Sequence, residues 1–254
     1  MTPLWTPPPA DGVHLWLLDL DVPRRLLPAL RATLSDEERA RADAFLFAPD
    51  SLRYAACHGL LRRVLAGYLG LAPAGIAYSV GRHGKPGLDP AHGSALRFNL
   101  SHSRDLGVCA VAVDREVGVD VERIRTDRDH AGLAERWFSP AERAAVRSLP
   151  RERRVRAFYD CWTRKEAYVK ARGDGLFLAL DSFDVTADPD QPAALLRSAG
   201  GEDEPDRWRM IGFTPVPGFA GALAVEGAGW TAVAVGPPPP GSGATTRRVP
   251  EVPR

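Results

Sequence analysis

The chain has 254 residues, 44% of them hydrophobic and 26% charged, with a formal net charge of +1. That length supports one large or two modest hydrophobic cores, and the near-zero charge argues against nucleic acid or a membrane surface as partner. With no apolar stretch of about 20 residues, no signal peptide and three scattered cysteines, we expect a cytoplasmic protein.

The first half of the chain alternates between strand and helix patterns. After an extended lead-in over residues 1–12, Ser35 and Glu38 form a capping-box pattern that opens a short helix. A longer amphipathic helix follows over about 50–69. The expected strands of this half cover residues 13–20, 76–80, 96–100 and 107–113.

The second half repeats this succession. Ser139, Pro140 and Glu142 predict a strong helix start, and a long helix is expected over 151–172, ending at Gly173. The expected strands cover residues 117–124, 182–187, 207–213, 221–226 and 230–235. Residues 236–254 are rich in Pro, Gly and Ser and are predicted to be disordered. We therefore expect an α+β fold with two similar α/β halves, residues 13–115 and 116–235.

The strand pattern "VGVDVERI" contains two carboxylates, Asp120 and Glu122, among valines. Side chains two apart in a strand point to the same face, about 6.5–7 Å apart. At an effective dielectric constant near 20, two such charges repel by about 2–3 kcal/mol. A solvated strand face would explain them, and so would a bound cation.

A third carboxylate, Glu166, lies near the middle of the apolar stripe of the helix at 151–172. A buried charge is costly unless it is paired or coordinates a metal. A pair with Lys170 at the edge of the stripe is one interpretation. Taken together, the three acidic residues favour a Mg²⁺-type site that acts on a phosphate-bearing substrate.

Four motifs occur in a characteristic order. These are "GKP" (84–86), "FNLSHS" (98–103), "GVDVERI" (118–124) and, about forty residues later, "FYDCWTRKEAYVKARGDGL". Their combination resembles the 4′-phosphopantetheinyl transferases of the Sfp type over about residues 13–235. The resemblance implies a pseudo-twofold α+β fold, with coenzyme A and Mg²⁺ between two halves of a monomer. It also implies transfer of 4′-phosphopantetheine to a serine of an apo acyl or peptidyl carrier protein, releasing adenosine 3′,5′-bisphosphate.

The resemblance also implies roles for individual residues. Asp120, Glu122 and Glu166 would hold Mg²⁺, and Glu166 would be the general base for the carrier serine, directly or through water. Catalysis is thus expected from Glu166, Lys170 and Asp120, with Lys170 on the pyrophosphate. The other expected coenzyme A contacts are Arg41 on the nucleotide, Arg53 on phosphate, and Lys85, Ser101 and His102 on the 3′-phosphate, with Pro86 stiffening the turn that presents Lys85. The chain departs from some relatives at Glu38, where they have lysine, and at Tyr54, where they have threonine.

Residues 123–156 contain ten arginines and five acidic residues. Carrier proteins are acidic, so this segment is a candidate docking surface, although a solvated arginine-rich face would have the same composition. Two other functions remain as alternatives. A metal-dependent phosphohydrolase acting on a nucleotide or on coenzyme A would use the same carboxylates, and a carrier-binding module would use none. The intact carboxylates and the "SHS" and "WTRKEAYVK" motifs favour the transferase.

Overall fold

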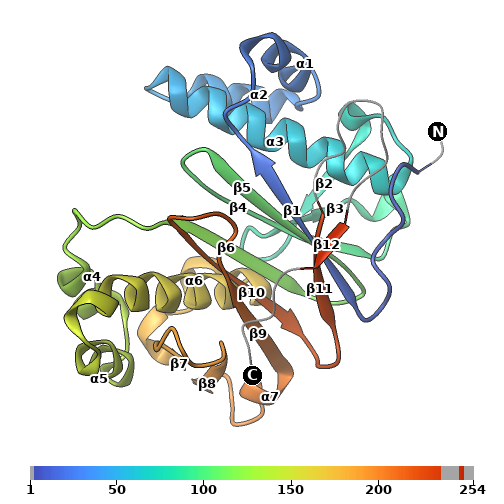
Figure 1. Cartoon of the computed structure of the whole chain (residues 1–254). Coiled ribbons are helices and arrows are strands. Elements are labelled where there is room, and N and C mark those ends of the chain that lie inside the picture. Colours follow the sequence, from blue (N-terminus) through green and yellow to red (C-terminus); the bar gives the residue numbers. More distant parts are fainter. Residues whose placement is uncertain (1–2, 236–245, 249–254) are drawn as a thin grey trace.

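Two β-sheets lie face to face at the centre of the molecule, and one long helix covers the outer face of each (Figure 1). The computed structural model describes residues 3–235 and 246–248. The first sheet comprises β12 (Thr246–Arg248), β11 (Thr231–Val235), β1 (Gly12–Asp19), β5 (Leu106–Val113) and β4 (Leu96–Ser103), in that spatial order. The second comprises β6 (Val117–Arg123), β10 (Phe219–Glu226) and β9 (Trp208–Phe213).

The remaining elements connect these strands in the same way in each half. In the first half they are α1 (Leu27–Arg31), α2 (Asp36–Asp43), α3 (Ala48–Leu69) and the hairpin β2 (Tyr78–Val80) and β3 (Pro86–Leu88). In the second they are α4 (His130–Trp137), α5 (Pro140–Ser148), α6 (Arg154–Arg172), the hairpin β7 (Phe183–Val185) and β8 (Leu195–Ser198), and α7 (Glu204–Arg207).

The two halves share one topology. Each runs through a strand, three helices, a hairpin and two further strands, and the second half adds the short α7 between its hairpin and those strands. The last of these pairs with the first, which gives the orders β1-β5-β4 and β6-β10-β9. This repeat confirms the predicted α+β fold of two similar halves. One strand crosses the division made from the sequence, because β11, from residues 116–235, pairs in parallel with β1 of the first sheet.

Local signals in the sequence account for the main helices. Ser35 with Glu38, and Ser139 with Glu142, form complete capping boxes at the starts of α2 and α5. The glycine that ends α6, Gly173, has a φ of 75°, a left-handed conformation that favours glycine. The expected helix at 151–172 begins as a 3₁₀ turn and becomes α-helical at residue 154.

Three short strands were missed by the sequence analysis. β3 and β8 have three and four residues, too few for an alternating pattern to be visible. β12 falls inside the predicted disordered tail and pairs antiparallel with β11, so that prediction is wrong for residues 246–248. An open strand edge supplies backbone partners that the composition of a tail does not reveal. The rest of the predicted tail, 236–245 and 249–254, lies outside the described residues.

Valine-rich strands build the layer between the sheets. Val119 and Val121 of β6 are fully buried against residues of β1 and β5 such as Leu15 and Val108. On the opposite face of β6, α6 approaches so closely that a Cβ at Gly118 would lie 2.1 Å from the carbonyl oxygen of Ala167. Glycine is therefore required at 118. Among the helices of residues 3–235, none combines the length and apolar character of a membrane span.

Candidate active site

The three predicted carboxylates lie on two elements that pack against each other. Asp120 and Glu122 project from β6 on the face opposite Val119 and Val121, which is the face covered by α6. Glu166 is on α6, one turn before Lys170. The alternation along β6 therefore sends valines into the core between the sheets and acids toward the helix.

Asp120 is buried, with an exposed fraction of 3%. Its Oδ1 accepts hydrogen bonds from Lys170 Nζ at 2.5 Å and from Ser101 Oγ at 2.8 Å. Its Oδ2 is also buried but has no hydrogen-bond partner among the described residues. An orphaned carboxylate oxygen in such a place is costly, and a bound cation or water would satisfy it.

Burial and the negative charge of Asp120 both raise the pKa of the other two carboxylates, Glu122 and Glu166. Burial raises the pKa of Glu166, the negative charge of Asp120 raises it further, and Lys170 lowers it. Burial and Asp120 likewise raise the pKa of Glu122, whose Oε2 accepts a hydrogen bond from Ser103 Oγ at 2.7 Å. The three acids therefore repel one another in a partly buried site.

The donor set suits a hard divalent cation, because it consists of carboxylate oxygens. Within residues 3–235 and 246–248, however, no three His, Cys, Asp or Glu side chains already converge into a metal-binding group. One oxygen of Asp120 is held by Lys170 and Ser101, and one oxygen of Glu122 by Ser103. Among the described residues, Asp120 Oδ2 is the one carboxylate oxygen that is buried without a hydrogen-bond partner.

Several predicted phosphate contacts gather beside this site. Partial desolvation lowers the pKa of His102, and the positive charges of His58, Lys170 and Arg53 lower it further. Arg53 pairs only with Asp50 in the described chain, at 3.2 Å. The positive groups are thus close enough to repel one another, which favours an anion between them.

Arg41 lies at the margin of this group, and the two departures from some relatives lie near it. Its guanidinium carbon is 5.8 Å from the centroid of the Tyr54 ring, and that ring stacks on His58 at 4.0 Å. Glu38 closes the capping box of α2 and accepts a bond from buried Arg62 at 2.6 Å. Both departures are therefore accommodated by contacts within this chain: Tyr54 packs against His58, and Glu38 bonds to Arg62.

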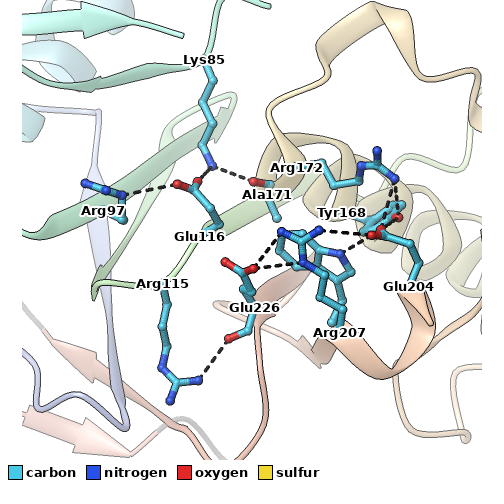
Figure 2. A network of polar contacts seen from close by, with 11 residues as sticks. Lys85, Arg97, Arg115, Glu116, Tyr168, Ala171, Arg172, Glu204, Arg207 and Glu226 are labelled. Carbon is cyan, nitrogen blue, oxygen red and sulfur yellow. Dashed lines mark hydrogen bonds and ion pairs between the residues drawn. The ribbon is translucent and has the colours of Figure 1, made fainter. Parts of the chain in front are cut away.

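Two predicted 3′-phosphate ligands have other partners in this structure. Lys85 Nζ donates to Glu116 Oε2 at 2.7 Å and to the carbonyl oxygen of Ala171 at 2.8 Å (Figure 2). It also donates to the carbonyl oxygen of Val117 at 3.0 Å. These bonds use all three protons of the ammonium group. The single hydroxyl proton of Ser101 is directed at Asp120. Neither side chain retains a donor for a phosphate in this arrangement.

The contacts of Lys85 belong to a larger polar network (Figure 2). Glu116 also pairs with Arg97 at 3.4 Å, so the start of β6 is tied to both β3 and β4. On the other side of β6, Glu226 pairs with Arg207 at 2.8 Å and its carbonyl oxygen accepts a bond from Arg115. The turn containing Lys85 and exposed Pro86 is thereby anchored to the C-terminal end of α6.

A hollow with a volume of about 390 Å³ lies beside Glu122 and was not predicted from the sequence. Its aromatic floor comes from α6, and arginines stand at its rim. The lining residues are Ser103, Arg104, Glu122, Arg123, Arg125, Arg128, Leu133, Phe158, Tyr159 and Trp162. The aromatic residues were visible in "FYDCW", but only the fold brings them beside β6.

Comparison with known proteins fits this geometry. Residues 116–224 match the 4′-phosphopantetheinyl transferase superfamily, and residues 24–132 match the family described as 4′-phosphopantetheinyl transferase, N-terminal. The 4′-phosphopantetheinyl transferase HetI of Nostoc sp. is 40% identical over 233 residues, covering 89% of this chain and 95% of that protein. The chain belongs to the 4′-phosphopantetheinyl transferase family.

Other members of this family are similar to the chain. The 4′-phosphopantetheinyl transferase Sfp of Bacillus subtilis is 32% identical over 155 residues, covering 60% of this chain and 66% of that protein. Among solved structures, the holo-[acyl-carrier-protein] synthase of Thermotoga maritima matches with a TM-score of 0.35 and 22% identity, covering 47% of this chain and 67% of that one. The predicted resemblance is confirmed, and the chain is an enzyme of this family, a 4′-phosphopantetheinyl transferase.

Proposed function

We propose that this transferase binds coenzyme A and Mg²⁺ where β4, β6 and α6 meet, and that Glu166 is the base for the carrier serine. The observation that carries the proposal is the buried Asp120. One of its oxygens is fixed by Lys170 and Ser101, and the other, near two further carboxylates, has no hydrogen-bond partner within the described part of the chain. When bound, Mg²⁺ would supply the positive charge that neutralises the pyrophosphate and the departing bisphosphate.

The protein's own groups account for the rest of the reaction. A carboxylate whose pKa is raised toward neutrality is a better base, so Glu166 suits removal of the serine proton. The serine oxygen then bonds to the phosphorus that carries the pantetheine, and the bond from that phosphorus to the bridging oxygen breaks. Lys170 donates hydrogen bonds to Asp120 and Ser101, so the third proton of its ammonium group can be donated to the pyrophosphate.

The nucleotide end of coenzyme A is assigned to the positive group on α2, α3 and β4. Arg41, Arg53 and His102 remain the proposed phosphate contacts, because none of them is fully occupied by other partners in the described chain. Lys85 and Pro86 are proposed to act by fixing the turn against α6, so that its backbone faces the ligand. Ser101 is considered below.

The carrier is proposed to approach over the hollow beside Glu122. Within the described chain, Arg123 and Arg128 at its rim are exposed and make no ion pair, so they can meet an acidic partner. Other arginines of the predicted docking segment are already engaged. Arg153 pairs with Asp188 and Asp190, and Arg154 donates to two backbone carbonyls. The docking surface is therefore narrower than the composition suggested.

The cytoplasm is the proposed compartment and a monomer the proposed state. The three cysteines are free and fully buried, and burial raises the thiol pKa of each, which suits a reducing environment. Two halves within one chain supply both walls of the site, so no second copy is needed to complete it.

Mass spectrometry of a carrier protein tests the proposal. The chain is incubated with coenzyme A, Mg²⁺ and an apo carrier domain, and the carrier should gain one phosphopantetheine. Chelation of the metal should stop the gain, and added Mg²⁺ should restore it. The Glu166→Gln variant should nearly abolish labelling without lowering the free energy of unfolding, because burial already disfavours the charged form.

Three outcomes would contradict the proposal. Breakdown of coenzyme A without labelling of the carrier would indicate a phosphohydrolase. Binding of the carrier without labelling or breakdown would indicate a binding module. Labelling by Glu166→Gln at most of the wild-type rate would remove Glu166 from the mechanism.

A further inference from the structure

Three polar side chains of β4 face β6 across the gap between the sheets. Asn99, Ser101 and Ser103 alternate along the strand and therefore share one face. The opposite face carries Leu96 and Phe98, which are buried in the core under α3. We name Asn99, Ser101 and Ser103 the β4 ladder.

The β4 ladder replaces a neighbouring strand along one edge of β6. In an antiparallel pair, alternate N–H groups point to opposite edges of a strand, and the other edge of β6 is paired with β10. The side chains of the ladder accept the bonds that a strand's carbonyls would accept. The contacts are Val119 N to Asn99 Oδ1 at 2.8 Å, Val121 N to Ser101 Oγ at 3.4 Å and Arg123 N to Ser103 Oγ at 3.1 Å.

The two serines also contact the two carboxylates of β6. The Oγ atom of each serine accepts a hydrogen bond from a backbone amide of β6. The single hydroxyl proton of each serine can therefore be donated to a different group. Ser101 directs it to Asp120 Oδ1 at 2.8 Å, and Ser103 directs it to Glu122 Oε2 at 2.7 Å. Ser101 additionally accepts a bond from Lys170 Nζ at 3.1 Å. Backbone pairing and carboxylate orientation are therefore coupled through the same two atoms.

This coupling fixes how Asp120 is presented. Ser101 and Lys170 both hold Oδ1, which leaves Oδ2 buried and without a partner among the described residues. Ser103 restrains Glu122 in the same manner, on the same face of β6. A hydrogen-bonded hydroxyl behind a ligating carboxylate is the usual means by which proteins orient metal ligands.

We propose that Ser101 and Ser103 are positioning residues that orient Asp120 and Glu122 toward the metal. Asn99 completes the ladder by aligning the backbone of β6 alone. The proposal rests on the proposed function insofar as it assigns a metal to these carboxylates.

Metal affinity gives the first test. Binding of Mn²⁺ in the presence of adenosine 3′,5′-bisphosphate is measured by electron paramagnetic resonance for Ser101→Ala and Ser103→Ala. Each should bind Mn²⁺ about 10–100-fold more weakly than the wild type. Ser101→Thr and Ser103→Thr, which keep the hydroxyl, should restore most of the affinity. Ser148→Ala, on exposed α5, is the matched control and should bind like the wild type.

Asn99→Ala is an internal control, because Asn99 bonds an amide of β6 and no carboxylate. It should speed hydrogen exchange at the Val119 amide while changing Mn²⁺ affinity less than either serine variant does. Affinity that falls equally in all three alanine variants would reduce the ladder to a purely structural role and overturn the proposal.

Coenzyme A that lacks its 3′-phosphate separates the two roles of Ser101. A positioning residue predicts that Ser101→Ala raises the Mg²⁺ requirement by the same factor with coenzyme A and with 3′-dephospho-coenzyme A. A residue that only binds the phosphate predicts that the variant raises the KM of coenzyme A and leaves that of the dephospho form, and the Mg²⁺ requirement, unchanged. The second pattern would overturn the proposal.

Failure of the ladder and failure of the proposed function are distinguishable. Wild-type protein that does not label a carrier would defeat the proposed function, but Mn²⁺ affinity and amide exchange would still report on the ladder. Wild-type protein that labels a carrier, with serine variants of unchanged Mn²⁺ affinity, would defeat the ladder alone.

Discussion

The two halves of the molecule repeat each other in topology and in a buried ion pair. In each half, the glutamate of a capping box accepts hydrogen bonds from a buried cation on the long helix. Glu38 pairs with Arg62 at 2.6 Å, and Glu142 pairs with Lys165 at 2.5 Å. In each half the cation also donates to a carbonyl oxygen just before or at the first strand of the hairpin, at Ile76 or Phe183.

The halves differ in what their first strands carry toward the long helix. The first strands of the two halves can be aligned by the last residue pair of each strand pairing, Asp19 with Leu106 and Arg123 with Phe219. In this alignment Asp120 corresponds to Trp16, and Glu122 corresponds to Leu18. Trp16 and Leu18 are buried in the core under α3.

The outer edges of the first strands differ as well. β1 is paired there with β11, whereas β6 meets the side chains of the β4 ladder. The comparison teaches that the same scaffold, with one buried ion pair per half, carries apolar residues at two positions of β1 and acidic residues at the corresponding positions of β6.

The buried pairs are the most sensitive part of the comparison. Lys165→Met leaves the fully buried Glu142 without its cation and should cost about 3–5 kcal/mol of unfolding free energy. Arg62→Met should cost less, about 2–3 kcal/mol, because Glu38 keeps His58 as a partner. Urea unfolding measures both. Recovery of stability is expected in the Lys165→Met/Glu142→Gln double variant, and a larger loss in the first half than in the second would contradict the ranking.

The acidic positions should separate the halves in activity. Asp120→Ala should lower the rate of carrier labelling by more than about 100-fold, because outer partners of metal ligands alone are worth 10–100-fold. Leu18→Met, at the position corresponding to Glu122, conserves volume in the first half and should leave the rate near that of the wild type. Comparable losses in both variants would show that the activity does not depend on the acids of β6.

Lys85 joins the two halves and tests how they are held together. Lys85→Met removes three hydrogen bonds and leaves the carbonyl oxygens of Val117 and Ala171 and the Glu116 carboxylate to find other partners. We expect a loss of about 1–3 kcal/mol in urea unfolding. The KM of coenzyme A relative to its 3′-dephospho form should stay unchanged. A rise confined to coenzyme A would restore the phosphate role that the motif suggested.

The rim arginines should distinguish the halves in carrier recognition. Reversing Arg123 and Arg128 to glutamate should raise the carrier KM by roughly tenfold at low salt, since complementary charges mainly speed encounter. Reversing Arg24 and Arg25, exposed in the first half, changes the net charge equally and serves as the control. Equal effects of the two double variants would reveal a net-charge effect without a docking surface.

The smallest effect concerns pH. Burial works against the charge of Glu38, but hydrogen bonds from His58, the Ser35 amide and Arg62 hold its pKa below the usual value. A lowered pKa stabilises the fold above the unfolded-state pKa, and this contribution is lost as pH falls through the folded-state pKa. Glu38→Gln should therefore be less stable than wild type near pH 7, and the difference should shrink below about pH 4. A constant difference across this range would exclude the linkage.

The sequence was sufficient for the parts of the site that lie on regular elements. The period-two pattern placed Asp120 and Glu122 on one face of β6, and the helical period placed Glu166 and Lys170 together on α6. It could not assign partners to long or hydroxylated side chains. Lys85 and Ser101 were both predicted to bind the 3′-phosphate, but the fold brings Ala171 and Asp120 within their reach.

The missed features share a physical cause. The β4 ladder depends on contacts between strands twenty residues apart, and the alternation of Asn99, Ser101 and Ser103 is equally typical of a solvated strand face. The strand β12 forms by pairing with the edge of β11, and no local sequence pattern indicates that this edge is nearby. Sequence periodicity reports which face of an element is apolar, and it does not report which element covers the other face.

The parallel pairing of β1 with β11 has a consequence for how the chain reaches its native state. β1 is synthesised long before β11, the strand with which it pairs. One edge of β1 therefore keeps its backbone groups unpaired until synthesis has reached the residues of β11. Such delayed closure slows folding and leaves a nascent chain open to association with other chains. Shortening the protein from its C-terminus before residue 231 would make that temporary vulnerability permanent.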